Sequence, residues 1–258
     1  ETDLDLHNGP GTFGGGLNGD VGLFANIAWV VEQPQVFAFA IPVLGVLGSI
    51  VPVATGVKAA RHSVSVTLIG LFGLLSIGAW SQPVFQNEGL YPHDEKFVYI
   101  AFGLAAVLPV LGAMGGAADT MMRGKDAIVG LPPAHLLLAL GSGVLLLAAT
   151  AAGVVQVIEG FDLGGRVSLT GVMNLTLFAA VTGAAAGMWF WASKIGRSSL
   201  SPLLGRLVAL DLIGGALLLG GAQVVNGFFE TEVGPGVAGL GAVQDGDVAD
   251  VLFVVSFI

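Results

Sequence analysis

Long apolar runs separated by short polar segments dominate the chain. They cover approximately residues 33–55, 64–85, 97–120, 132–157, 169–193 and 203–228, and a further run opens near residue 248. Each complete run is about as long as an α-helix must be to cross a hydrocarbon core of ~30 Å. The runs do not alternate polar and apolar residues as a transmembrane β-barrel would. The pattern predicts an all-α, polytopic transmembrane bundle with six full spans and the start of a seventh.

The two ends of the chain depart from this pattern. Residues 1–21 are rich in glycine and acidic side chains, which predicts an exposed tail, whereas residues 22–258 are predicted to form one transmembrane domain. Residues 22–32 carry Trp29 among other apolar side chains, which is typical of a short interfacial helix. The last run, 248–258, is too short to cross a membrane. We therefore expect a longer or processed polypeptide.

The composition agrees with a lipid-facing surface. Hydrophobic residues make up 54% of the chain and charged residues only 10%, against roughly 25% in a soluble domain. The nine Lys and Arg residues are spread along the chain, which argues against a nucleic-acid partner. The chain has no cysteine, so disulfides, thiolate metal sites and cysteine nucleophiles are excluded.

The basic residues of the loops predict the orientation of the bundle. Loops 56–63, 121–131 and 194–206 hold seven of the nine, and the opposite loops hold only Lys96 and Arg166. Because cytoplasmic loops carry an excess of Lys and Arg, these three loops are expected in the cytoplasm and the Glu1 tail outside. The predicted location is a prokaryotic cell membrane.

Two pairs of glycines occur at helix-packing spacing. Gly112 and Gly116 lie in one span, and Gly183 and Gly187 lie in another. Glycines four residues apart let helix backbones approach closely inside a membrane. We expect these pairs to pack within the bundle, and the alternative is an interface with a partner subunit.

One segment resembles a known family. Residues Trp29-Val-Val-Glu-Gln-Pro-Gln-Val-Phe37, followed by Pro42 and Pro52, resemble the sixth helix of haem-copper oxidase subunit I, which reads Trp-Phe-Phe-Gly-His-Pro-Glu-Val-Tyr. Residues 79–85 are similar to the end of its seventh helix, and 189–197 to the close of its tenth. The resemblance implies that the seven runs correspond to the sixth through twelfth helices of a respiratory oxidase subunit.

The copper and proton-transfer positions of that family are substituted here. The three histidines that hold copper in the family fall on Gln33, Ser81 and Gln82. The tyrosine crosslinked to a copper ligand falls on Phe37, and the proton-relaying glutamate on Gln35. A copper ion that cycles between Cu(I) and Cu(II) in a nitrogen site prefers imidazole donors, which these side chains do not supply.

The haem positions are substituted as well. The two haem-ligating histidines fall on Asn174 and Thr176, and the lysine of a proton path falls near Ala113. Haem iron is held by His, Met, Cys or Tyr, and Asn or Thr are poor ligands. Residues 169–193 contain no histidine, so a small error in alignment would not restore a ligand. We expect neither haem nor copper to be bound by this segment.

The leading hypothesis is therefore a catalytically silent relative of oxidase subunit I. It would be a structural subunit of a respiratory oxidoreductase complex, with the lipid bilayer and other subunits as partners. A second hypothesis is a pocket for a quinone, a lipid or a small solute, lined by Gln33, Gln35, Gln82 and Asn174. Weaker alternatives are an active oxidase whose metal ligands lie outside this segment, and an independent transporter.

The remaining polar candidates are few. His7, His62, His93 and His135 lie in the tail, in loops or at a span end, and no two share a helix face. Asp211 lies deep in the run 203–228. An acidic residue at that depth usually faces the bundle interior and has a partner or a task. We expect Asp211 to pair with a hydroxyl, an amide or Arg206, and the alternatives are a proton relay or partner docking.

Overall fold

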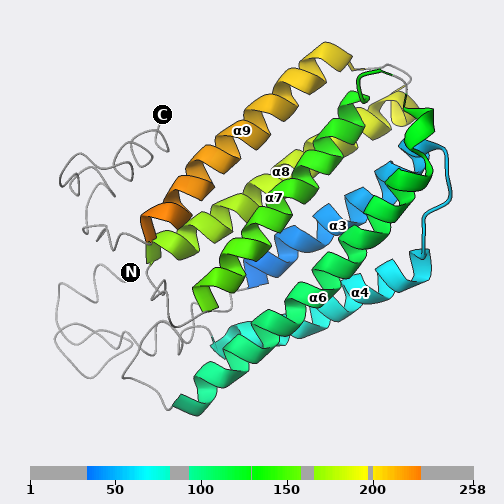
Figure 1. Ribbon diagram of the computed structural model, residues 1–258. Coiled ribbons are helices and arrows are strands. Elements are labelled where there is room, and N and C mark those ends of the chain that lie inside the picture. Colours follow the sequence, from blue (N-terminus) through cyan, green and yellow to red (C-terminus); the bar gives the residue numbers. More distant parts are fainter. Residues whose placement is uncertain (1–33, 82–92, 129, 158–165, 197–199, 228–258) are drawn as a thin grey trace, which may run out of the picture.

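The protein is described by a computed structural model over residues 34–81, 93–128, 130–157, 166–196 and 200–227 (Figure 1). Within these ranges all regular structure is helical. The α-helices are α3 (Pro34–Thr55), α4 (His62–Leu75), α6 (His93–Arg123), α7 (Ala134–Val157), α8 (Arg166–Ile195) and α9 (Pro202–Gly227). Two 3-10 helices, η1 (Ser76–Ser81) and η2 (Lys125–Ala127), follow α4 and α6. The predicted all-α class is confirmed for the described residues.

In the described part of the chain, five helices are long and apolar enough to cross a membrane, namely α3, α6, α7, α8 and α9. Their bounds lie within a few residues of the predicted spans, because a hydrophobic run of this length has few alternatives to a helix in lipid. The chain is thus a multi-pass membrane protein. The predicted tail 1–21, the interfacial helix 22–32 and the run from 248 lie outside the described residues.

The predicted span 64–85 differs from the structure. The α-helix α4 ends at Leu75, and η1 continues as a tighter 3-10 helix to Ser81. The hydroxyl of Ser76 donates to the carbonyl of Gly73 at 2.7 Å, and Gly78 packs so closely on Phe102 of α6 that no Cβ would fit. The predicted span is thus helical as far as Ser81 with a change of helix type at Ser76, and its last four residues lie outside the described ranges.

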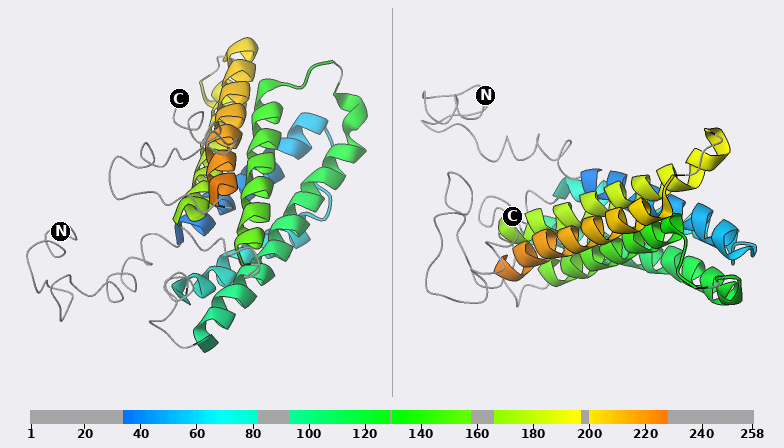
Figure 2. Two further views of the ribbon diagram at one scale, coloured as in Figure 1. Left: turned by 60° about the vertical axis from the view of Figure 1, so that its left-hand side comes forward. Right: turned by 90° about the horizontal axis from the view of Figure 1, so that it is seen from above.

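The helices run side by side in a bundle with α3 near its centre (Figures 1 and 2). Helix α3 contacts α4, α6, α7 and α8. Helices α7, α8 and α9 contact one another on one side of it, and α4 packs on α6 on the other. Most connections are short, so sequential helices are antiparallel neighbours.

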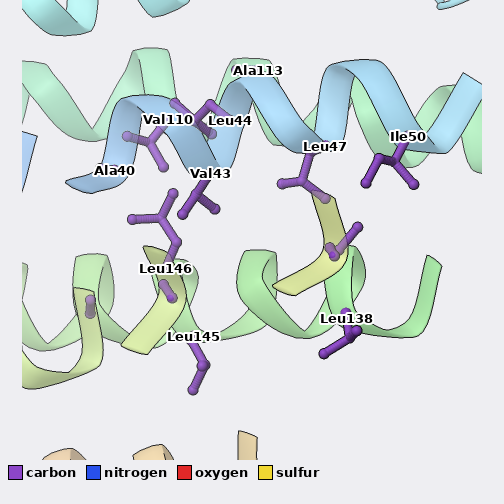
Figure 3. Close-up of a cluster of buried hydrophobic side chains, with 14 of the residues drawn as sticks. Ala40, Val43, Leu44, Leu47, Ile50, Val110, Ala113, Leu138, Leu145 and Leu146 are labelled. Atoms are coloured by element: carbon purple, nitrogen blue, oxygen red, sulfur yellow. The ribbon is translucent and has the colours of Figure 1, made fainter. Parts of the chain in front are cut away.

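The core is formed by the inward face of α3 and its neighbours (Figure 3). Ala40, Val43, Leu44, Leu47 and Ile50 follow the three- and four-residue spacing of one helix face, and all are buried. They meet buried side chains of α6 and α7, which include Val110, Ala113, Leu138, Leu145 and Leu146. The outer surface is also apolar, with large exposed side chains such as Leu108 and Leu210. A surface of this kind suits lipid.

Three of the four glycines in the predicted pairs pack against neighbouring helices of the bundle. A Cβ on Gly112 would lie 2.6 Å from Leu68 of α4, and Gly116 faces Ser65 of the same helix. Gly183 lies against Ser142 of α7 and Val43 of α3. Gly187 is the exception, because its nearest neighbour is Trp191 of its own helix. Three of the four glycines therefore serve contacts between helices of this chain.

Most basic residues at the described helix ends lie at one end of the bundle, and only Lys96 and Arg166 lie at the other. Lys58 and Arg61 follow α3, Arg123 ends α6, Lys194 lies in the last turn of α8 and Arg206 in the first turns of α9. These helix ends lie together in Figure 1. Arg123 also forms an exposed ion pair with Asp119 at 2.8 Å. The bundle thus has one basic end, as the loop pattern predicted.

A buried hydroxyl ties the loop after α3 to α6, which yields a first prediction. Thr120 accepts a hydrogen bond from the backbone N–H of Ala60 at 2.9 Å and donates to the carbonyl of Gly116 at 2.7 Å. Replacing Thr120 by valine keeps the shape but leaves that N–H without an acceptor. We expect the free energy of unfolding to fall by about 1–2 kcal/mol, measured by denaturant titration in detergent. Thr120→Ser, which keeps the hydroxyl, should lose less than half as much.

Candidate functional site

The first half of α8 presents two different faces to its neighbours. Asn174 points to α9, where its amide nitrogen donates to the side-chain oxygen of Gln223 at 2.7 Å. Val172, Met173 and Thr176 instead line a cavity on the other side of α8. Residues two positions apart on a helix differ by about 200° in direction, which separates Asn174 from Thr176. The structure therefore does not bring these two predicted positions together.

The cavity has a volume of about 150 Å³ and lies among α3, α4, α6, α7 and α8. Its walls are mostly aliphatic and aromatic, and they include Phe37, Phe72, Phe102, Val110 and Leu146. Phe37 packs on Phe72 with their ring centroids 4.8 Å apart. The predicted position Phe37 is thus part of the cavity wall, where it offers an apolar ring without a hydroxyl.

Three polar side chains also line the cavity, namely Thr150, Gln156 and Thr176. The hydroxyl of Thr150 donates to the carbonyl of Leu146 at 2.7 Å, and that of Thr176 donates to the carbonyl of Val172 at 2.8 Å. Both hydroxyl hydrogens are therefore used within their own helices. Thr150 and Gln156 were not among the site residues predicted from the sequence. Their polar side chains within an apolar run could have indicated that they face a cavity.

The residues of this cavity do not fit a haem and copper pair. Among the described lining residues there is no imidazole, thiolate or phenol, and Met173 supplies their one thioether. A redox-active copper in a nitrogen site prefers imidazole donors, and haem iron is held by His, Met, Cys or Tyr.

The histidines of the described helices lie at helix ends. His62 begins α4 and His135 is the second residue of α7, with its ring 5.6 Å from that of Phe190. His93 begins α6, and neither His62 nor His135 lines the cavity next to Thr176. Within the described ranges no three His, Cys, Asp or Glu side chains cluster as metal ligands would.

A second cavity of about 190 Å³ lies nearer the basic end, among α3, α4 and α6. Its lining includes the predicted position Ala113 together with Ser49, Ser65, Thr120 and His62. Ala113 lies one helical turn from Val110, which lines the first cavity. The small side chain at position 113 thus leaves space where the resemblance implies a lysine.

Four of the predicted site residues have no described side chain. Gln33 and Gln82 lie outside the described residues. Gln35 lies in the first turn of α3 and Ser81 at the end of η1, where only the backbone is described. The predicted pocket of four amides is therefore tested only at Asn174. That amide bonds Gln223 of α9 and is not part of the described lining of the cavity, and the pocket of four amides stays a prediction.

Asp211 lies on the exposed side of α9, which contradicts the expected inward orientation. Arg206 is five residues earlier and so about 140° away around the helix. Its guanidinium donates to the carbonyl of Pro132 at 3.3 Å, toward the bundle. Of the three partners expected for Asp211, which were a hydroxyl, an amide or Arg206, the described residues show Arg206 bonded to Pro132 instead.

The family assignment rests on sequence comparison together with this fold. Residues 3–232, which include every described residue, match the family "Cytochrome C and Quinol oxidase polypeptide I". The chain belongs to this haem-copper oxidase subunit I family. Comparison with curated proteins found no match. The resemblance based on residues 29–52 is thus confirmed for the family.

The amide pair between α8 and α9 of this oxidase-family chain allows a second prediction. Asn174→Leu removes the donor and leaves the buried Gln223 oxygen without its partner. We expect a loss of about 1–2 kcal/mol in the free energy of unfolding, the upper range for hydrogen bonds between membrane helices. The double variant Asn174→Leu/Gln223→Leu should recover most of this loss, because both polar groups are then removed. Equal stability of wild type and single variant would contradict the prediction.

Proposed function

We propose that this chain is a member of the oxidase family that does not itself reduce oxygen. In this proposal it serves as a structural subunit of a respiratory membrane complex. The supporting observation is the cavity beside Thr176, whose walls are apolar and whose threonine hydroxyls donate to carbonyls of their own helices. Oxygen reduction in a haem-copper site needs firmly held metals and a proton supply, and none of the described cavity side chains offers either.

The substitutions at the family's metal-ligand and proton-transfer positions also support this proposal. Gln33, Ser81 and Gln82 stand where the family places copper ligands, and Asn174 and Thr176 where it places haem ligands. Gln35 stands at the position of the proton-relaying glutamate and has no ionisable group. We infer that the segment binds no haem or copper of its own.

The test is metal and haem analysis of the intact complex purified from its native membrane. We expect substoichiometric copper, and no carbon-monoxide-sensitive haem that depends on this chain. An active oxidase purified in the same way from the same membranes is the control for metal loss. Stoichiometric copper with a high-spin haem held by residues 1–258 would overturn the proposal. Haem that is retained in the Asn174→Leu and Thr176→Val variants would indicate ligands outside this segment. That result would favour the weaker alternative of an active oxidase.

A second candidate function is the binding of an apolar molecule in the cavity. The apolar walls favour a quinone ring or a lipid chain over a polar solute, because a polar molecule would find few free partners there. Organic extraction of the purified chain followed by mass spectrometry tests this candidate. We expect one quinone or lipid species enriched over the bulk membrane extract, and an extract with the bulk composition would oppose it.

The orientation is a further part of the proposal. The end of the bundle with Lys58, Arg61, Arg123 and Lys194 is inferred to face the cytoplasm of a prokaryotic cell. Since the chain contains no cysteine, single cysteines placed beside Lys58 or Lys96 can report sidedness. An impermeant thiol reagent applied to intact cells should label only the cysteine beside Lys96.

A further inference from the structure

Asp211 is an acidic residue near the middle of a membrane-spanning helix. It is the tenth residue of α9, so it lies about 14 Å along the axis from Pro202 in a helix of 26 residues. The whole of α9 qualifies as a membrane span by length and composition. Its side chain is exposed, with no hydrogen bond or ion pair within the described part of the chain.

The surroundings of Asp211 on α9 are apolar and partly hollow. Leu207, Leu210 and Leu218 share this side of the helix and are 54%, 68% and 50% exposed. Gly214 and Gly215 lie between them, and a Cβ on either would meet no atom within 4 Å. We call these five residues and Asp211 the Asp211 face.

Within the described residues, no cationic side chain is placed beside Asp211. Every Lys and Arg lies between residues 58 and 206, so residues 1–33 and 228–258 contain none. Arg206 points toward Pro132, and the other described basic residues lie at the ends of helices or in loops. An ionisable residue within a membrane span is usually paired with another group, and no Lys or Arg side chain in the described part of the chain pairs with Asp211.

We propose that the Asp211 face is a docking surface for a transmembrane helix of a partner subunit. The partner helix carries a lysine or arginine at the depth of Asp211, and charge complementarity selects it. Gly214 and Gly215 allow the two backbones to approach closely, as small residues do between membrane helices. A second copy of this chain is a poor occupant, because a symmetric pair would place two Asp211 side chains together.

The first experiment locates the occupant by photo-crosslinking in the intact complex. The cysteine-free chain accepts a single cysteine at Leu218, on the Asp211 face, which then carries a benzophenone group. A cysteine at Leu108, 72% exposed on α6, is the matched control. We expect the Leu218→Cys probe to label a transmembrane peptide of another subunit with Lys or Arg within one turn. Labelling of lipid alone, of this chain or of a second copy would overturn the proposal.

The second experiment tests the charge. Asp211→Leu should lower the crosslink yield about tenfold, within the range for one polar contact between membrane helices. Asp211→Glu should retain the crosslink, and replacing the partner's cation by leucine in the Asp211→Leu background should restore it. Unchanged yield in Asp211→Leu, with the same thermal stability as the wild type, would refute the role of the carboxyl group. None of these readouts depends on the metal content of the complex, so this proposal and the proposed function fail separately.

Discussion

Replacing Gly171 by isoleucine should lower the free energy of unfolding by about 3 kcal/mol, which is the upper end of the usual cost of overpacking a core. Gly171 of α8 lies against the backbone of α9, where an added Cβ would be 2.8 Å from the Gly220 carbonyl oxygen and 2.8 Å from the Val224 backbone nitrogen. Backbone atoms of a packed helix cannot rotate away as a side chain can. The two helices must therefore separate, which also weakens the hydrogen bond between Asn174 and Gln223 one turn away.

The measurement is the free energy of unfolding in detergent, followed by helical circular dichroism. Gly70→Ile on α4 is the matched control, because no atom lies within 4 Å of a Cβ placed on Gly70. The control should change stability by less than about 1 kcal/mol, the size of the helix-propensity difference. Comparable stability of the two variants would show that α8 and α9 are not in close backbone contact.

Filling the cavity should abolish the binding of apolar molecules. Ala149 of α7 is buried and lines the cavity of about 150 Å³, so phenylalanine at this position would occupy much of the space. We expect the dissociation constant for a short-chain quinone or a benzene-sized probe to rise more than about tenfold, since a filled pocket has no room for the ligand. The binding is measured by equilibrium dialysis in detergent.

The control uses the same substitution on the outer side of the same helix. Val144 is 51% exposed on α7, and Val144→Phe adds the ring without reaching the cavity. Binding should be unchanged in this control. If Ala149→Phe binds the probe as well as Val144→Phe does, the cavity is not the binding site, and the second candidate function fails.

The sequence by itself determined the class of the fold and the positions of most helices. Runs such as 132–157 and 203–228 are hydrophobic over the length of a membrane span, and α7 and α9 follow them closely. This works because backbone groups in lipid must form their hydrogen bonds within the helix. The absence of histidine from residues 169–193 is likewise a fact of composition, and it motivates the proposed loss of haem ligation.

Only the tertiary structure decided which way the polar side chains point. Asn174 faces Gln223, Thr176 faces the cavity and Asp211 faces outward, although all three lie in apolar runs. Helices α8 and α9 are apolar all around, so their sequences carry no strong face that would reveal their rotation. The change from α4 to η1 at Ser76 was also hidden, because it coincides with the contact between Gly78 and Phe102, which are distant in sequence. The rotation of each helix about its axis and its helix type depend on the helices that contact it, and those contacts are set by tertiary packing.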